Sequence, residues 1–156
     1  MSLSLNSQLL SSCSDDSSIR LWTTNQFSHH NQPTTNYKSR NTWRSPEQKK
    51  VKRASFCGSE KLAASTHGGG VYFFDVENLK KPEWFKQLTA DQGLITDLIT
   101  APDMEQKGQI IFATSSGHVV GLDVRSGKES FKMDHESRHG VVTSICGDNR
   151  DRFIIR

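Results

Sequence analysis

The sequence predicts an all-β chain built from repeated antiparallel sheet units, and two observations carry this prediction. One phrase occurs three times, at 9–23, 62–75 and 110–123: a short apolar strand, a turn rich in Ser, Asp, Thr and Gly, and a second strand ending in a bulky residue followed by an acidic or polar one. The copies also recur at a nearly constant period, because 52 residues separate Trp22 from Phe74 and 48 separate Phe74 from Leu122. Apolar strands bounded by turn residues indicate β-hairpins, and a fixed period indicates a repeat architecture.

A hairpin repeated at this period is typical of one blade of a WD-repeat β-propeller, whose repeats run about 40–45 residues. Each blade is a four-stranded antiparallel sheet that its neighbours cover on both faces. We therefore predict an incomplete WD-repeat β-propeller of about two and a half blades. Because closed rings need roughly 4–8 blades, we expect the 156 residues to be part of a larger scaffold. An open array would expose an apolar blade face at each end.

The first 49 residues predict a partial blade followed by an insertion. Residues 1–23 are expected to form this partial blade, with strands at 8–12 and 19–23. The segment 24–49 is rich in Asn, Gln, Thr, Ser and His and holds too few apolar residues to bury a face. We predict a polar and basic loop insertion there, which replaces or extends an outer strand.

The remaining residues predict two blades and the start of a third. Residues 50–90 form the clearest blade, with strands expected at 51–57, 61–65, 70–76 and 84–88. Residues 91–134 repeat this plan, with strands expected at 94–100, 109–114, 118–124 and 129–133. Residues 135–156 are expected to begin a further, truncated blade, with strands at 141–146 and from 153 onward. No segment keeps a helical spacing of apolar residues over three turns.

Charge and cysteine content narrow the functional classes. The net charge is +3, but cations and anions are interspersed along most of the chain, so charge alone selects no class of partner. Cys13, Cys57 and Cys146 are far apart and form no CxxC pair, which argues against a zinc site and against a disulfide framework. Three unpaired cysteines favour a reducing compartment. We expect no cofactor and no metal; a chelate of His29 and His30 with Cys57 is disfavoured because both histidines lie in a polar loop.

Two motifs suggest catalysis, and both are better explained as turns. Residues 67–70, with the sequence HGGG, match the oxyanion loop of esterases, but the chain lacks the GxSxG nucleophile elbow that this chemistry requires. Residues 126–128, with the sequence SGK, end before a Glu, where a phosphate-binding loop needs a hydroxyl for magnesium. Glycine-rich hairpin turns account for both segments. With no acid/base pair or nucleophile arrangement, we predict no catalytic residue and no small-molecule substrate.

A basic cluster and two tryptophans are the candidate interaction residues. Lys49, Lys50, Lys52 and Arg53 could bind an anionic lipid, a nucleic acid or an import receptor. Strand alternation offers another explanation, in which Val51 points inward and the lysines lie on a solvated face. Few aromatic residues lie nearby for base stacking, which disfavours nucleic acid. Trp43 and Trp84 are candidate partner contacts if they are exposed, because Trp is frequent in binding hot spots.

Three segments resemble one family. The sequences RHGVVTSIC at 138–146, GLDVRSG at 121–127 and VKRASFC at 51–57 are similar to the C-terminal WD-repeat propeller of the regulatory subunit of class III phosphatidylinositol 3-kinase. This family is also known as phosphoinositide 3-kinase regulatory subunit 4, or the vacuolar protein sorting protein kinase family. The chain departs from the general WD pattern, since Thr23 follows Trp22, and Phe74 and Leu122 stand where Trp is usual.

The resemblance implies a role in a complex that makes phosphatidylinositol 3-phosphate for endosomal sorting and autophagy. It implies protein partners, namely the lipid-kinase catalytic subunit and Beclin-like coiled-coil subunits, and a cytoplasmic location peripheral to endosomal membranes. Members of the family carry a serine/threonine protein-kinase-like domain, whose GxGxxG, HRD and DFG motifs are absent from this chain, so no kinase residue transfers to it. The alternative is a standalone WD-repeat adaptor whose basic loop serves nuclear import or nucleic-acid binding.

Overall fold

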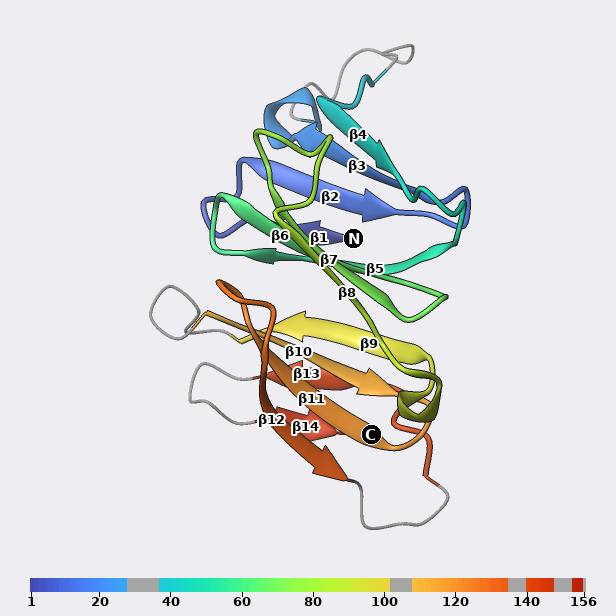
Figure 1. Ribbon diagram of the computed structural model, residues 1–156. Helices are drawn as coiled ribbons and strands as arrows, with labels where there is room; N and C mark the ends of the chain where they lie inside the picture. Colours follow the sequence, from blue (N-terminus) through green and yellow to red (C-terminus); the bar gives the residue numbers. More distant parts are fainter. Residues whose placement is uncertain (28–36, 102–107, 135–139, 148–152, 156) are drawn as a thin grey trace.

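Three four-stranded antiparallel sheets and one two-stranded sheet follow one another along the molecule (Figure 1). The computed structural model describes residues 1–27, 37–101, 108–134, 140–147 and 153–155. In each four-stranded sheet the spatial order of the strands is the chain order, so every strand pairs with its neighbours in sequence. This is the up-and-down meander of a propeller blade, and it confirms the predicted all-β fold.

The four sheets are named blades A to D in chain order. Blade A holds β1 (Ser2–Leu3), β2 (Leu9–Cys13), β3 (Ser18–Thr23) and β4 (Asn41–Arg44). Blade B holds β5 (Val51–Cys57), β6 (Lys61–Thr66), β7 (Gly70–Asp75) and β8 (Trp84–Gln87). Blade C holds β9 (Ile95–Thr100), β10 (Gln109–Thr114), β11 (His118–Asp123) and β12 (Glu129–Asp134). Blade D holds β13 (Ile145–Gly147) and β14 (Phe153–Ile155). Two short 3-10 turns, η1 (Thr24–Phe27) and η2 (Ala90–Gln92), complete the elements, and no α-helix occurs in the described ranges.

The repeated phrase of the sequence is the hairpin formed by the second and third strands of each blade. β2 pairs with β3, β6 with β7, and β10 with β11. The residue that closes each turn has a positive φ: Ser17 at 68°, Gly69 at 77° and Gly117 at 81°. Glycine adopts this backbone conformation at little cost. The glycines of the last two copies therefore shape hairpin turns, as the sequence predicted for 67–70.

Each pair of neighbouring blades encloses its own apolar core. Between blades A and B, Ile19 and Leu21 of β3 meet Tyr72 and Phe74 of β7. Between blades B and C, the alternate residues of β7, Val71 and Phe73, meet Val120 and Leu122 of β11. A third core joins blade C to Ile145 of blade D and to Val142, which precedes the first strand of that blade. Alternate residues of one strand thus point to the preceding and to the following blade, as strand geometry requires.

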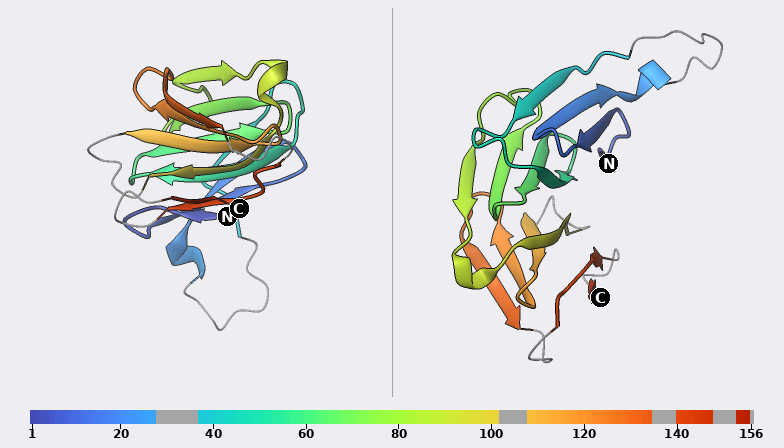
Figure 2. Two further views of the ribbon diagram at one scale, coloured as in Figure 1. Left: turned by 90° about the horizontal axis from the view of Figure 1, so that it is seen from below. Right: turned by 90° about the vertical axis from the view of Figure 1, so that its right-hand side faces the viewer.

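The blades form an open arc. In the right-hand view of Figure 2 the sheets succeed one another along a curve, with both chain ends on its concave side. In blades B and C the second and third strands, β6, β7, β10 and β11, are buried over most of their length, because neighbouring blades cover both of their faces. Arrays of this kind place their loops at two opposite edges, where the strands of every blade end.

The structure corrects the predicted strands at three places. Asn41–Arg44 is the outer strand β4, paired with β3, although 24–49 was predicted to be a loop insertion. Ser2–Leu3 adds an inner strand, so blade A has four strands and the described residues hold three four-stranded blades rather than two and a half. Within the described residues, the strand predicted at 141–146 begins only at Ile145, and Ile145–Gly147 pairs with Phe153–Ile155.

Candidate functional site

The junction of blades A and B has two opposite loop edges that carry the candidate residues. Antiparallel strands reverse direction at each turn, so the turns 14–17 and 67–69 and the connection 45–50 lie at one edge. The turns 4–8 and 58–60 and the connection 76–83 lie at the other edge. The first is called the basic edge because it carries the predicted basic cluster, and the second the pocket edge.

At the basic edge, most of the predicted cationic groups are already paired with carboxylates. The Lys50 ammonium lies 2.9 Å from Asp15, and Lys49 forms an ion pair with Glu47. The Lys50 ammonium also holds the pKa of the Asp15 carboxyl below its ordinary value. Among the described residues, the Lys52 side chain forms no ion pair. The structure thus brings the lysines together but compensates most of their charge.

Arg53 belongs to the contact between blades and only partly to the basic edge. Its Nε donates to Oδ1 of Asp97 at 2.7 Å, so the inner strand of blade B is tied to that of blade C. The Asp97 side chain is only 11% exposed. Its two carboxylate oxygens also accept the backbone N–H groups of Leu98 and Ile145, the second from blade D. Asp97 therefore joins three blades, a role that no sequence pattern indicated.

Trp43 lies in the core and not on the surface. Its side chain is 5% exposed and packs against Tyr72 and Phe74, with ring centroids 4.8 and 5.0 Å apart. It is the one buried residue of β4, so burial against blade B fixes its orientation. In this placement Trp43 presents almost no surface to a partner.

Trp84 is half-buried and links blades B and C. Its Nε1 donates to the carbonyl oxygen of Val124 at 2.7 Å, and its ring stacks on Phe73 with centroids 5.3 Å apart. A Cβ at Gly127 would lie 3.1 Å from the same ring, so the indole covers this glycine closely. The contact of Trp84 with the next blade is established, and any contact with a partner stays a prediction.

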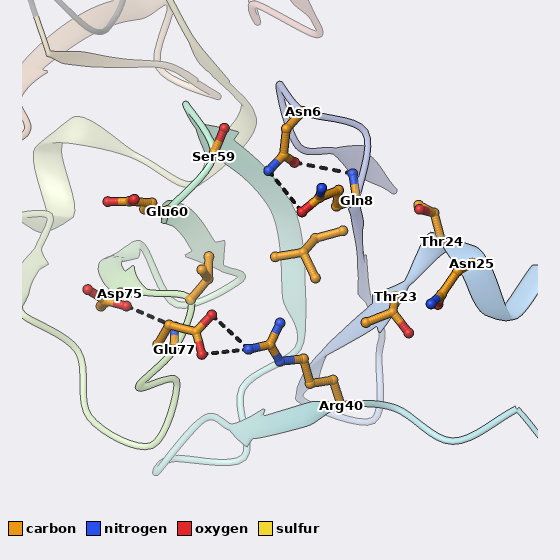
Figure 3. A pocket seen from close by; sticks show the side chains of 12 residues that line it. Asn6, Gln8, Thr23, Thr24, Asn25, Arg40, Ser59, Glu60, Asp75 and Glu77 are labelled. Atoms are coloured by element: carbon orange, nitrogen blue, oxygen red, sulfur yellow. Dashed lines mark hydrogen bonds and ion pairs between the residues drawn. The ribbon is translucent and has the colours of Figure 1, made fainter.

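The pocket edge holds an open polar pocket of about 700 Å³ between blades A and B (Figure 3). One wall comes from blade A and carries amides and hydroxyls, from Asn6, Gln8, Thr23, Thr24 and Asn25. The opposite wall comes from blade B and carries the carboxylates of Glu60, Asp75 and Glu77. Figure 3 shows the carboxylates on one side and Thr23, Thr24 and Asn25 on the other.

Arg40 joins the two walls of the pocket. One of its terminal nitrogens lies 2.7 and 2.5 Å from the two carboxylate oxygens of Glu77. Beside it, the Asn41 side chain donates to the carbonyl oxygen of Val76 at 3.2 Å, which fixes the connection 76–83 against blade A. The amide wall is ordered as well, since Asn6 Oδ1 accepts from the hydroxyl of Ser4 at 2.8 Å and from the backbone of Gln8. Both walls are therefore held in place by contacts within the chain.

The carboxylate of Asp75 is fixed and ionised. It accepts the backbone N–H of Glu77 at 2.8 Å and the ammonium of Lys61 at 3.0 Å. These two hydrogen bonds, the first being the larger cause, hold the pKa of Asp75 below its ordinary value. Lys61 also pairs with Glu83, and this pairing raises the pKa of the lysine. The Asp75 carboxylate thus stays ionised at neutral pH, paired with the Lys61 ammonium.

The motifs that suggested catalysis occupy structural turns. Gly69 N–H donates to the carbonyl oxygen of Thr66 at 3.0 Å, so 67–70 closes the β6–β7 hairpin. The segment around Ser126 closes a turn in which Asp123 Oδ1 accepts the Ser126 N–H and hydroxyl. Burial raises the pKa of the Cys57 thiol, which keeps it protonated. His29 and His30 lie outside the described residues, within which no group of three His, Cys, Asp or Glu side chains is placed to hold a metal.

Within the described part of the chain, no helix has the length and apolar character needed to cross a membrane.

Comparison with solved structures identifies the fold. Over 92% of its length the chain superimposes on a chain in the crystal structure of the mitotic checkpoint complex, with a TM-score of 0.71 and 14% identity. Over 94% of its length it superimposes on Raptor from Chaetomium thermophilum, with a TM-score of 0.70 and 15% identity. The chain spans 38% and 12% of the lengths of these two chains. No family model matches the sequence. The fold is an incomplete WD-repeat β-propeller.

Proposed function

We propose that the chain is a non-catalytic WD-repeat scaffold of the regulatory subunit of the class III phosphatidylinositol 3-kinase complex. The observation that carries the scaffold role is the arc of blades: three apolar cores hold neighbouring sheets together, and the loops lie at two edges. Because a fold alone does not determine function, the proposal rests on these loop surfaces as binding sites for partner proteins. One of the similar structures is itself a multiprotein assembly by its title, which agrees with a role in assembly.

The particular complex is supported by the resemblance of 51–57, 121–127 and 138–146 to the family's propeller. In the structure, 51–57 is the inner strand β5, and 121–127 covers the end of β11 and the turn that follows it. Residues 138 and 139 lie outside the described ranges. By this proposal the partners are the lipid-kinase catalytic subunit and the coiled-coil subunits, and contact with endosomal membranes is indirect, through the complex.

The test is reconstitution with purified subunits. The full chain is mixed with the lipid-kinase catalytic subunit and the Beclin-like coiled-coil subunit, and co-elution is followed by size-exclusion chromatography. We expect a stoichiometric complex containing the chain. A chain that shows a cooperative unfolding transition by circular dichroism, yet elutes apart from both subunits, would contradict the assignment to this complex.

A further inference from the structure

The pocket at the junction of blades A and B combines two kinds of recognition group. Blade A supplies neutral amides and hydroxyls that both donate and accept hydrogen bonds, among them Asn6, Gln8 and Asn25. Such groups match the alternating N–H and C=O groups of an extended peptide. Blade B supplies carboxylates, which are acceptors only. A ligand that satisfies both walls must present peptide-like groups to the blade A wall and a positively charged hydrogen-bond donor to the blade B wall.

The charges that line the pocket favour a cation over an anion. Three carboxylates line the pocket and only one guanidinium, that of Arg40, although the whole chain has a net charge of +3. Arg40 is engaged by Glu77, and Asp75 is engaged by Lys61. Among the described residues, Glu60 forms no ion pair, and the Glu77 side chain is 69% exposed. An incoming cation would find the exposed Glu60 carboxylate without an ion-pair partner among the described residues and would share the exposed Glu77 carboxylate with Arg40, whereas an anion would meet repulsion from the same wall.

We propose that this pocket binds an arginine or lysine side chain of an extended peptide segment in a partner protein. The side chain enters between the blades and pairs with Glu60 and Glu77, while the peptide's amide groups hydrogen-bond to the blade A wall. The size fits, because pockets of roughly 300–1,000 Å³ hold ligands of this scale. Preorganisation also favours binding, since the Arg40 and Asn41 contacts hold both walls before a ligand arrives. This inference rests on the proposed scaffold function.

The test is a nuclear magnetic resonance titration of the full chain with the probe peptide acetyl-Ala-Gly-Arg-Gly-Ala-amide. We expect saturable shifts of the backbone amides of Asn6, Gln8, Asn25, Glu60 and Glu77, and weaker binding at high salt. The same peptide with citrulline in place of arginine keeps the shape and removes the charge, so it should produce much smaller shifts. The substitution Glu60→Gln should weaken binding by about fivefold, from loss of one accessible ion pair.

A matched variant separates the pocket from general charge effects. Glu129→Gln removes the same charge from an exposed position on blade C and should leave the titration unchanged. Equal shifts with the arginine and citrulline peptides, shifts unaffected by Glu60→Gln, or no saturable shift would each overturn the pocket proposal. A chain that fails this titration but still co-elutes with the lipid-kinase subunits would leave the scaffold function standing, so the two failures are distinguishable.

Discussion

Nε of Arg53 lies 2.7 Å from Oδ1 of Asp97, and this contact ties the inner strand of blade B to that of blade C. Arg53 was predicted to belong to a basic interaction patch, and the structure shows that its charge is matched by a nearly buried carboxylate. The other oxygen of Asp97 accepts the Ile145 N–H at 3.1 Å, so one carboxylate holds blades B, C and D together.

Asp97→Asn should lower the free energy of unfolding by about 1–3 kcal/mol, because an amide nitrogen cannot accept the hydrogen bond that one carboxylate oxygen receives. Arg53→Ala should have a smaller effect, about 0.5–1 kcal/mol, since the arginine side chain is 52% exposed. Urea denaturation of the two variants measures both values. Equal losses would mean that Asp97 acts only as the partner of Arg53.

Trp43→Ala should destabilise the chain by about 3–5 kcal/mol, as expected for a buried aromatic side chain. Phe85→Ala provides the control, because Phe85 is an aromatic residue of an outer strand that is 46% exposed. Denaturant midpoints of the two variants are compared. A Trp43→Ala variant as stable as the Phe85→Ala variant would contradict the packing of β4 against blade B.

Gly69→Ala should lower the free energy of unfolding by about 1–2 kcal/mol, because a side chain is strained at its φ of 77°. A Cβ at Gly69 would meet only ordinary contacts of 3.4 Å or more, so the cost comes from the backbone. Gly68→Ala is the matched control: its Cβ would displace only the exposed end of Lys49, and the loss should be small. Thermal melts of both variants separate backbone strain from crowding.

Asp75→Asn should destabilise the chain at neutral pH, and the difference from the unsubstituted chain should vanish in acid. The folded-state pKa of Asp75 is lowered, chiefly by the Glu77 N–H and then by Lys61. The stabilisation is therefore complete above the unfolded pKa, about 3.9, and is lost as the pH falls through the lower folded pKa. Unfolding free energies measured between about pH 3 and pH 7 test this. A difference that shrinks between pH 5 and 7 would contradict it.

The repeated hairpins could be predicted because each lies within one short stretch of sequence. In β6 and β7, for example, two apolar strands are joined by a glycine-containing turn. β4 could not, since only Trp43 of its four residues is buried and polar residues flank it. β1 is two residues long and is defined only by its pairing with β2. Such strands depend on a neighbouring sheet, which local composition does not reveal.

The candidate sites, too, could be predicted only where their residues lie close together in the sequence. The basic cluster could be located from the sequence because its residues are consecutive, but its pairing with Asp15, Glu47 and Asp97 depends on tertiary structure. The pocket could not be predicted at all, because its walls come from separate loops of two blades. Each of these loops looks like an ordinary polar connection when it is read alone.

The central claim is that the chain is a preformed scaffold whose loop edges, and not its strands, meet the partner. Hydrogen–deuterium exchange of the full chain, alone and with the lipid-kinase catalytic and coiled-coil subunits, tests this directly. We expect β6, β7, β10 and β11 to be protected in the free chain, with new protection on binding confined to loops at one edge. Strands that become protected only in the complex, or loops that gain no protection, would contradict the account.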